Sequence, residues 1–455
     1  MTQQSRRPFP AGEPSRSPSP AHQPAGRPAR EPGRRTVVRG SLGIGAAALA
    51  APLLSACGGG PAADPKTVTF GSNGADATPK KAYSAVTGAF TEDSGLKVKT
   101  NTVDHDTFQK SISTYLQGTP DDVFTWFAGY RMQYFAKKKL ARPIDDVWEK
   151  IGSGFSDAAK QLSKGEDGTY YFVPLYNYPW AVFYRKSLFK EKGYEVPRTW
   201  SQFTALAKQM KKDGLSPIAS GYGGGDSWSV LGAFDYLNLR ANGYDFHMDL
   251  MRGEVAWTDR RTTRTLDLWR ELSGFYQQGA GGRSWQDAAQ SLLAKKSGMA
   301  VIGLFLGQQI TDEKLRADID FFPFPEVEPA HGQETVEAPT DGFMLSRKPK
   351  NPKGAAKLLE FLGSAEAESL YMGVDPSNVA VNSDADTGKY NALQKKSADL
   401  IASAKHITQF GDRDSDPGFI STVVLPGFTQ WLGHPDDGTA LLKKIESQRS
   451  RFFTA

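Results

Sequence analysis

Side chains that commonly do chemistry occur throughout this sequence, but not in the groupings that catalysis or metal binding requires. The histidines lie far apart and show no metal-ligand spacing; they are His22, His105, His247, His331, His406 and His434. Neither a Gly-x-Ser-x-Gly nucleophile elbow nor a Walker phosphate-binding motif is present. We therefore expect no metal, no cofactor and no enzymatic activity.

The acidic and glycine-rich stretches also give no indication of an enzyme or a metal site. Neighbouring residues on a strand point to opposite faces, so two adjacent carboxylates cannot form the convergent pair that a glycosidase needs. We interpret such pairs as parts of solvated turns. They are Asp121-Asp122, Asp145-Asp146 and Asp436-Asp437. The glycine run at 221–225 lacks a following Gly-Lys-Ser/Thr, which predicts a flexible loop. Residues 412–416 begin like a calcium loop, but Pro417 and Val423 replace its glycine and glutamate. We interpret that segment as a surface loop.

The first 56 residues have the composition of an export leader. They hold eight arginines and two glutamates, so 47 of the 55 basic and 48 of the 50 acidic residues come after position 56. The rest of the chain is therefore nearly neutral and shows no footprint for nucleic acid. Paired arginines at Arg34-Arg35 precede a short apolar run, which is typical of a cleaved signal peptide and favours the twin-arginine route.

The single cysteine, Cys57, ends the sequence Leu54-Ser55-Ala56-Cys57. This resembles a bacterial lipobox, in which the cysteine thiol receives the lipid. An exported chain with one cysteine has no internal disulfide, so lipidation explains the residue. The sequence predicts a Tat-like leader over residues 1–56, a lipidated cysteine with a flexible tether over 57–65, and anchoring to the outer face of the cytoplasmic membrane.

Short β-like runs alternate with amphipathic helical stretches after the tether. Strands are expected at 67–70, 96–100, 123–127, 182–184, 299–306 and 343–345, and helices at 79–94, 106–117, 200–212, 352–362 and 439–453. Residues 321–325 are expected to form an extended connector. Strands that alternate with helices predict an α/β fold, with ligand-binding loops at the carboxyl ends of the strands.

Several segments together resemble family 1 extracellular solute-binding proteins, the group that contains maltose-binding protein. The resemblance depends on their order along the chain; they are Val103 to Trp126, Tyr170 to Pro174, Val182 to Phe189, Pro197 to Trp200, Gly298 to Ala300 and Asp341 to Leu362. It implies a two-lobe periplasmic-binding-protein fold of type II. We expect one lobe at 64–172 plus 323–375 and the other at 176–320 plus 380–455. The candidate crossings are Val173-Pro174, Phe322-Pro323 and Asp375-Pro376.

The resemblance also implies a ligand cleft between the lobes. A sugar site combines aromatic platforms with a few placed polar side chains. The match puts Trp126, Tyr178 and Phe305 at positions where the family contacts ligand. Further candidates are Asn73 after the first strand, Trp180 beside the first crossing, Asp226 and Trp228 after the glycine run, and Asp341 in a turn ahead of a strand. Asp104 and His105 precede a helix, where capping is the expected role.

The function that this resemblance implies is capture of a mono- or oligosaccharide by hinge closure and its delivery to the permease of an ABC importer. We expect a monomer whose partners are the sugar, the permease subunits and, through Cys57, the membrane. The same fold could instead bind a polyamine, an iron complex or a glycerophosphodiester. A lipoprotein sensor or adhesin remains a further alternative, whereas a secreted glycosidase or lyase is disfavoured because no convergent carboxylate pair is evident.

Overall fold

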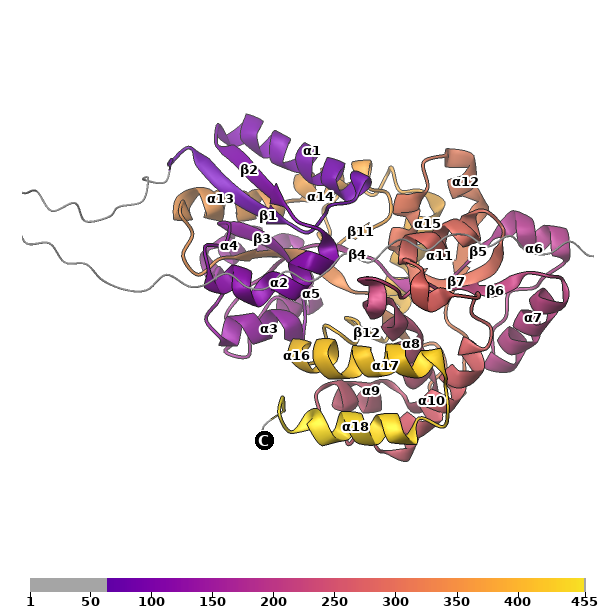
Figure 1. The fold of residues 1–455 in the computed structure, drawn as a ribbon. Helices are drawn as coiled ribbons and strands as arrows, with labels where there is room; N and C mark the ends of the chain where they lie inside the picture. The colour runs from indigo at the N-terminus through magenta and orange to yellow at the C-terminus, as the bar shows by residue number, and fades with distance from the viewer. Residues whose placement is uncertain (1–63, 454–455) are drawn as a thin grey trace, which may run out of the picture. The chain divides into compact units, whose positions relative to one another are not determined.

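Strands and helices alternate along residues 64–453, the part of the chain that the computed structural model describes (Figure 1). The predicted leader and Cys57 lie outside these residues. The described strands form two larger sheets and one two-stranded sheet. The mixed α/β class predicted from the sequence is confirmed.

The first sheet has six strands in the order β11-β4-β10-β3-β1-β2. Its strands are β1 (Thr67–Ser72), β2 (Lys97–Thr102), β3 (Val123–Phe127), β4 (Val173–Asn177), β10 (Thr340–Leu345) and β11 (Val379–Ala380). Strand β1 pairs in parallel with β2 and β3, whereas β10 runs antiparallel to β3 and β4. All five residues of β3 are buried, as expected for an uninterrupted apolar strand inside a covered sheet.

Helices from distant parts of the chain surround this sheet. They are α1 (Ala77–Ser94), α2 (His105–Gln117), α3 (Tyr130–Lys137), α4 (Asp145–Ile151), α5 (Asp157–Leu162), α13 (Pro352–Leu362) and α14 (Ala365–Val374). Helix α13 packs on four of the strands, and α14 lies along α1. Helix α13 begins where the sequence predicts, because Pro352 occupies its first turn and Asn351 caps it.

The second sheet has four strands in the order β6-β7-β5-β8. They are β5 (Trp180–Arg185), β6 (Ser216–Ala219), β7 (Ser297–Gly303) and β8 (Ile319–Phe322). The expected strand at 299–306 ends at Gly303, and a 3₁₀ turn over Leu304–Gln309 follows. The expected connector at 321–325 was also partly wrong, because Phe321 and Phe322 pair with β5.

The remaining helices accompany the second sheet or the C-terminal part of the chain. They are α6 (Lys186–Lys192), α7 (Trp200–Lys212), α8 (Leu231–Asn242), α9 (Tyr244–Met251), α10 (Arg260–Ser273), α11 (Trp285–Leu293), α12 (Glu313–Asp318), α15 (Ala392–Ser403), α16 (Pro417–Phe419), α17 (Leu425–Gly433) and α18 (Thr439–Arg449). The small third sheet pairs β9 (Thr335–Glu337) with β12 (His406–Thr408). None of the helices described here is long and apolar enough to span a membrane.

The chain passes between the two larger sheets later than the expected first crossing at Val173-Pro174. Both residues belong to β4, and the chain leaves that sheet after Asn177. Pro174 is tolerated there because the pairing of β4 with β10 is irregular between Asp341 and Gly342. The crossing expected at Asp375-Pro376 also comes later, because β11, which follows these residues, still pairs with β4 in the first sheet.

Gly342 permits β10 to approach β4 beside the irregularity. A Cβ atom at this position would collide with the Val173 carbonyl oxygen and crowd the Pro174 Cα. We expect Gly342→Ala to lower the free energy of unfolding by about 1–3 kcal/mol, because backbone atoms must shift. Urea denaturation measures this change. Gly88→Ala on α1, where a Cβ meets no atom within 4 Å, is the matched control, and equal effects of the two substitutions would contradict the prediction.

Candidate functional site

A cavity of about 160 Å³ lies where the two larger sheets come together. Its lining combines residues from the six-stranded sheet, such as Tyr176 and Asp341, with residues around the four-stranded sheet, such as Trp180 and Phe305. One water occupies roughly 10–15 Å³ on a comparable measure, so roughly ten water-sized groups fit. That is the scale of one sugar ring with its hydroxyls.

Most of the residues proposed from the sequence are brought together by the fold. The cavity is lined by Tyr178, Phe305, Trp228, Asp341, Asn73, Asp226 and Trp180. Phe305 reaches it from the 3₁₀ turn after β7, and Tyr178 from the segment between β4 and β5.

Trp126 is placed elsewhere. Its side chain is only 1% exposed and packs against Phe108 and Phe135, away from the cavity lining. Side chains alternate along a strand, and Thr125, the preceding residue, bonds to the cavity residue Asn73. Phe127 lies on the side of the cavity residues, with its ring 5.8 Å from that of His105.

A buried charged cluster forms one wall of the cavity. Asp341 on β10 accepts a hydrogen bond from Arg413 Nη1 at 2.6 Å and another from the Tyr178 hydroxyl at 3.2 Å. The second guanidinium nitrogen, Nη2, donates to the same tyrosine oxygen. Burial raises the pKa of Asp341, while the adjacent guanidinium opposes that effect. The arginine therefore holds a buried carboxylate in place beside the cavity.

Arg413 belongs to the segment at 412–416, and the prediction of a surface loop there was wrong. All five residues are buried. Two of the segment's charges are paired within the fold, since Asp412 pairs with Arg131 at 3.0 Å and Arg413 pairs with Asp341. A run of alternating charges resembles a solvated turn in sequence, and its partners lie far away along the chain.

His105 is a second cavity residue that sequence reasoning did not select. Asp104 caps α2 as expected, accepting from the Thr107 amide at 3.0 Å. His105, one position later, lines the cavity and lies 6.2 Å from Trp228, ring centre to ring centre. Burial and the nearby charges of Arg413 and Arg131 lower its pKa to about 4. The imidazole is therefore neutral at physiological pH.

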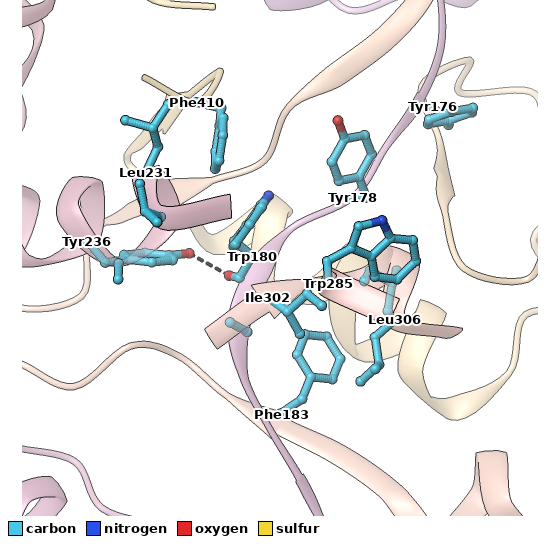
Figure 2. Close-up of a cluster of buried hydrophobic side chains, with 14 of the residues drawn as sticks. Tyr176, Tyr178, Trp180, Phe183, Leu231, Tyr236, Trp285, Ile302, Leu306 and Phe410 are labelled. Carbon is cyan, nitrogen blue, oxygen red and sulfur yellow. Dashed lines mark hydrogen bonds between the residues drawn. The ribbon is translucent and has the colours of Figure 1, made fainter. Parts of the chain in front are cut away.

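Aromatic rings form another part of the cavity lining, and Figure 2 shows Tyr178, Trp180, Trp285 and Phe410 among them. Trp180 stacks on Phe410 with ring centres 4.7 Å apart, and Trp285 meets Phe305 edge-on at 5.0 Å. The Tyr236 hydroxyl donates to the Trp180 carbonyl oxygen and holds the start of β5. In the described part of the chain, the indole nitrogens of Trp180 and Trp228 have no hydrogen-bond partner. This part of the lining offers apolar ring faces, with the two indole nitrogens buried behind its surface.

The model of the bacterial extracellular solute-binding protein family matches residues 31–369. The chain belongs to this family. The resemblance inferred from the sequence is confirmed.

Individual members of the family show how far the similarity extends. A solved structure of the bacterial solute receptor AcbH is 47% identical, with a TM-score of 0.83, and the match covers 85% of this chain and 99% of that one. AcbH has an exclusive substrate preference for β-D-galactopyranose. An uncharacterized ABC transporter extracellular-binding protein of Pyrococcus horikoshii is 24% identical over 64% of this chain and 65% of its own length.

A third relative is similar over a larger share of both chains than the Pyrococcus protein. The osmoprotective compounds-binding protein GgtB of Synechocystis is 23% identical, over 78% of this chain and 86% of its own length. The fold of this solute-binding protein is the two-lobe α/β architecture of its structural neighbours.

The two sides of this solute-binding protein also meet at the rim of the cavity. The glycine run at 221–225 reaches the N-terminus of α2, where a Cβ on Gly225 would collide with the Asp106 carboxylate. The prediction of a flexible loop for this run needs correction, since the Gly223 amide donates to the Arg283 carbonyl at 2.8 Å. A Cβ on Gly221 would strike the backbone of Ser284. These glycines permit close backbone packing beside the cavity.

Proposed function

We propose that this protein captures a monosaccharide of the galactopyranose class and delivers it to the permease of an ABC importer. The observation that carries this proposal is the small cavity, whose walls pair aromatic rings with the Asp341–Arg413 cluster. Aromatic faces suit the C–H faces of a sugar, and fixed polar groups suit its hydroxyls. The 47% identity to a receptor that prefers β-D-galactopyranose supports the same ligand class.

The alternative solutes fit this cavity less well. A polyamine needs several carboxylates without a partner. Of the six aspartates that line the cavity, three are paired with a cation and two accept hydrogen bonds from backbone amides. An iron complex would favour free paired tyrosines, but Tyr170 and Tyr171 lie outside the lining. Tyr176 and Tyr178 do line the cavity, and both of their hydroxyls donate to Asp341. A neutral, hydroxylated ring matches the lining best.

Export and assembly complete the proposal. We infer that the leader is removed, that Cys57 carries a lipid, and that the protein acts as a monomer at the outer face of the cytoplasmic membrane. The two lobes, roughly residues 64–177 with 340–380 and 180–322 with 392–453, close on the sugar by a hinge motion. Closure requires contacts that form only in the closed state, such as those at the glycine-rich rim.

We expect D-galactose to bind, and galactose-containing disaccharides to bind at least 100-fold more weakly because the cavity has room for about one ring. Isothermal titration calorimetry measures both affinities. A thermal-shift screen gives an independent reading, since a ligand at a hundred times its Kd adds about 2.7 kcal/mol of stability.

The screen should also include glucose, a polyamine, a ferric complex and a glycerophosphodiester. Binding of the polyamine, the ferric complex or the glycerophosphodiester, with no response to any sugar, would overturn the carbohydrate assignment. Disaccharides that bind as tightly as galactose would contradict the single-ring cavity.

A further inference from the structure

A chain of hydrogen bonds runs from the charged segment at 412–416 to the imidazole of His105. Asp412 Oδ2 pairs with Arg131 Nη1 at 3.0 Å, and the same nitrogen donates to Gln109 Oε1 at 2.6 Å. The amide nitrogen of Gln109 lies 2.6 Å from His105 Nε2. Gln109 and His105 are four residues apart on α2, so they share one face of the helix.

The direction of these bonds determines which ring nitrogen of His105 carries the proton. A guanidinium can only donate, so the Gln109 oxygen is the acceptor and its Nε2 faces the ring as a donor. His105 Nε2 must then accept, and because the ring is neutral its single proton resides on Nδ1. Arg131 is 6% exposed, so its end of this arrangement is shielded from solvent, whereas Gln109 and His105 are half-buried.

Nδ1 of His105 faces a second donor. It lies 3.3 Å from Nδ2 of Asn73. The orientation of the Asn73 amide follows from Thr125: the threonine oxygen accepts from the Asn73 backbone amide, and its hydroxyl proton goes to Asn73 Oδ1, both at 3.0 Å. Within residues 64–453, neither the Nδ1–H group nor this amide N–H has a protein acceptor.

Two N–H donors that face each other without an acceptor are costly in a cavity. An oxygen placed beside both of them removes that cost, whereas a second donor, such as an ammonium group, increases it. Both residues line the cavity. Resting on the proposed function, we propose that Asn73 and His105 form a donor pair that selects one sugar oxygen as an acceptor, with Gln109 and Arg131 as positioning residues.

Calorimetric titration of the full protein with D-galactose and its monodeoxy and monodeoxyfluoro derivatives tests this pair. At one ring position, we expect deoxygenation to weaken binding roughly 10- to 100-fold, because both donors lose their acceptor. Fluorine accepts but cannot donate, so the fluoro derivative at that position should recover part of the loss. The corresponding amino sugar should bind no better than the deoxy sugar.

Substitutions at His105 and Gln109 show whether these residues cause the discrimination between galactose and the deoxy sugar. In His105→Phe, we expect galactose and the critical deoxy sugar to bind within about 3-fold of each other, since the two changes remove the same interaction. His105→Asn keeps an N–H near the place of Nδ1 and should restore the discrimination. Gln109→Met frees the ring to change tautomer and should reduce the discrimination. Gln209→Met, at an exposed glutamine of α7 that bonds to Asp213, should leave the discrimination unchanged.

The outcomes separate the two proposals. If galactose binds but His105→Phe discriminates against each deoxy sugar as the unaltered protein does, the donor pair is overturned and the sugar-binding function stands. That result is expected if Asn73 turns its oxygen toward His105. If no sugar binds the folded protein, both proposals fail. Melting temperatures of all variants show whether each remains folded.

Discussion

Replacing Arg413 by methionine is expected to weaken sugar binding at least 100-fold. The guanidinium uses separate nitrogens to hold Asp341 and Tyr178, so its loss releases two cavity residues at once. It also leaves a buried carboxylate without a counter-charge, a change that typically costs about 3–5 kcal/mol of stability. Calorimetry and urea denaturation at pH 7 measure the two effects.

The charge and the forked geometry of Arg413 can be separated. Arg413→Lys keeps the charge but cannot reach both partners from one planar group, so we expect intermediate affinity and a smaller loss of stability. Arg264→Met is the matched control, since Arg264 is 47% exposed and its ion pair with Glu328 lies at the surface. Sugar affinity that is unchanged in Arg413→Met would exclude the charged cluster from the binding site.

The second large effect concerns a buried group of carboxylates behind the cavity. Asp235 on α8, Glu337 on β9 and Asp414 are all buried. Asp235 Oδ2 accepts from the Gly411 amide at 2.8 Å, and Asp414 Oδ2 accepts from the Gln409 amide at 2.7 Å. Neither carboxylate oxygen of Glu337 has a hydrogen-bond partner among the described residues. Asp235 and Asp414 therefore hold the segment that carries Arg413, with Glu337 buried beside them.

Burial controls the protonation of this group. It raises the pKa of Asp414 to about 7, and burial together with nearby carboxylates such as Asp414 raises the pKa values of Asp235 and Glu337 well above the usual range. Above the ordinary carboxyl pKa, the native state therefore retains protons that the unfolded chain releases. The contribution of these three carboxyl groups to stability is largest below the ordinary carboxyl pKa. It falls as the pH rises toward their pKa values in the folded protein.

Glu337→Gln should therefore stabilise the protein at pH 8, by roughly 2 kcal/mol, and much less near pH 4. The amide remains neutral and can donate to the neighbouring Asp235 carboxylate. Urea denaturation from pH 4 to pH 8 measures the difference. Glu334→Gln, whose side chain is 53% exposed and pairs with Lys405, should show no such growth with pH. If the difference in unfolding free energy between Glu337→Gln and the unaltered protein stays constant or shrinks toward pH 8, the protonation assigned to Glu337 is wrong.

Local chemistry in the sequence determined many elements and their class. The run Val123–Phe127 is apolar enough to predict a buried strand, and Thr199 with Gln202 forms the capping box that begins α7. Such signals depend on residues that are close together in the sequence, so they can be recognised without knowledge of the fold. The order of the motifs along the chain then indicated the family, and through it Tyr178 and Phe305.

The face of a strand and the partners of a charge were decided by tertiary structure alone. Trp126 lies in a strand that is buried on both sides, so no polar alternation distinguishes its two faces, and the sheet turns Phe127 toward the cavity residues. Arg413 and Asp412 resemble a solvated loop in sequence, but they find Asp341 and Arg131 far away along the chain. Local sequence determines which groups are present, whereas their burial and pairing depend on contacts that only the folded chain makes.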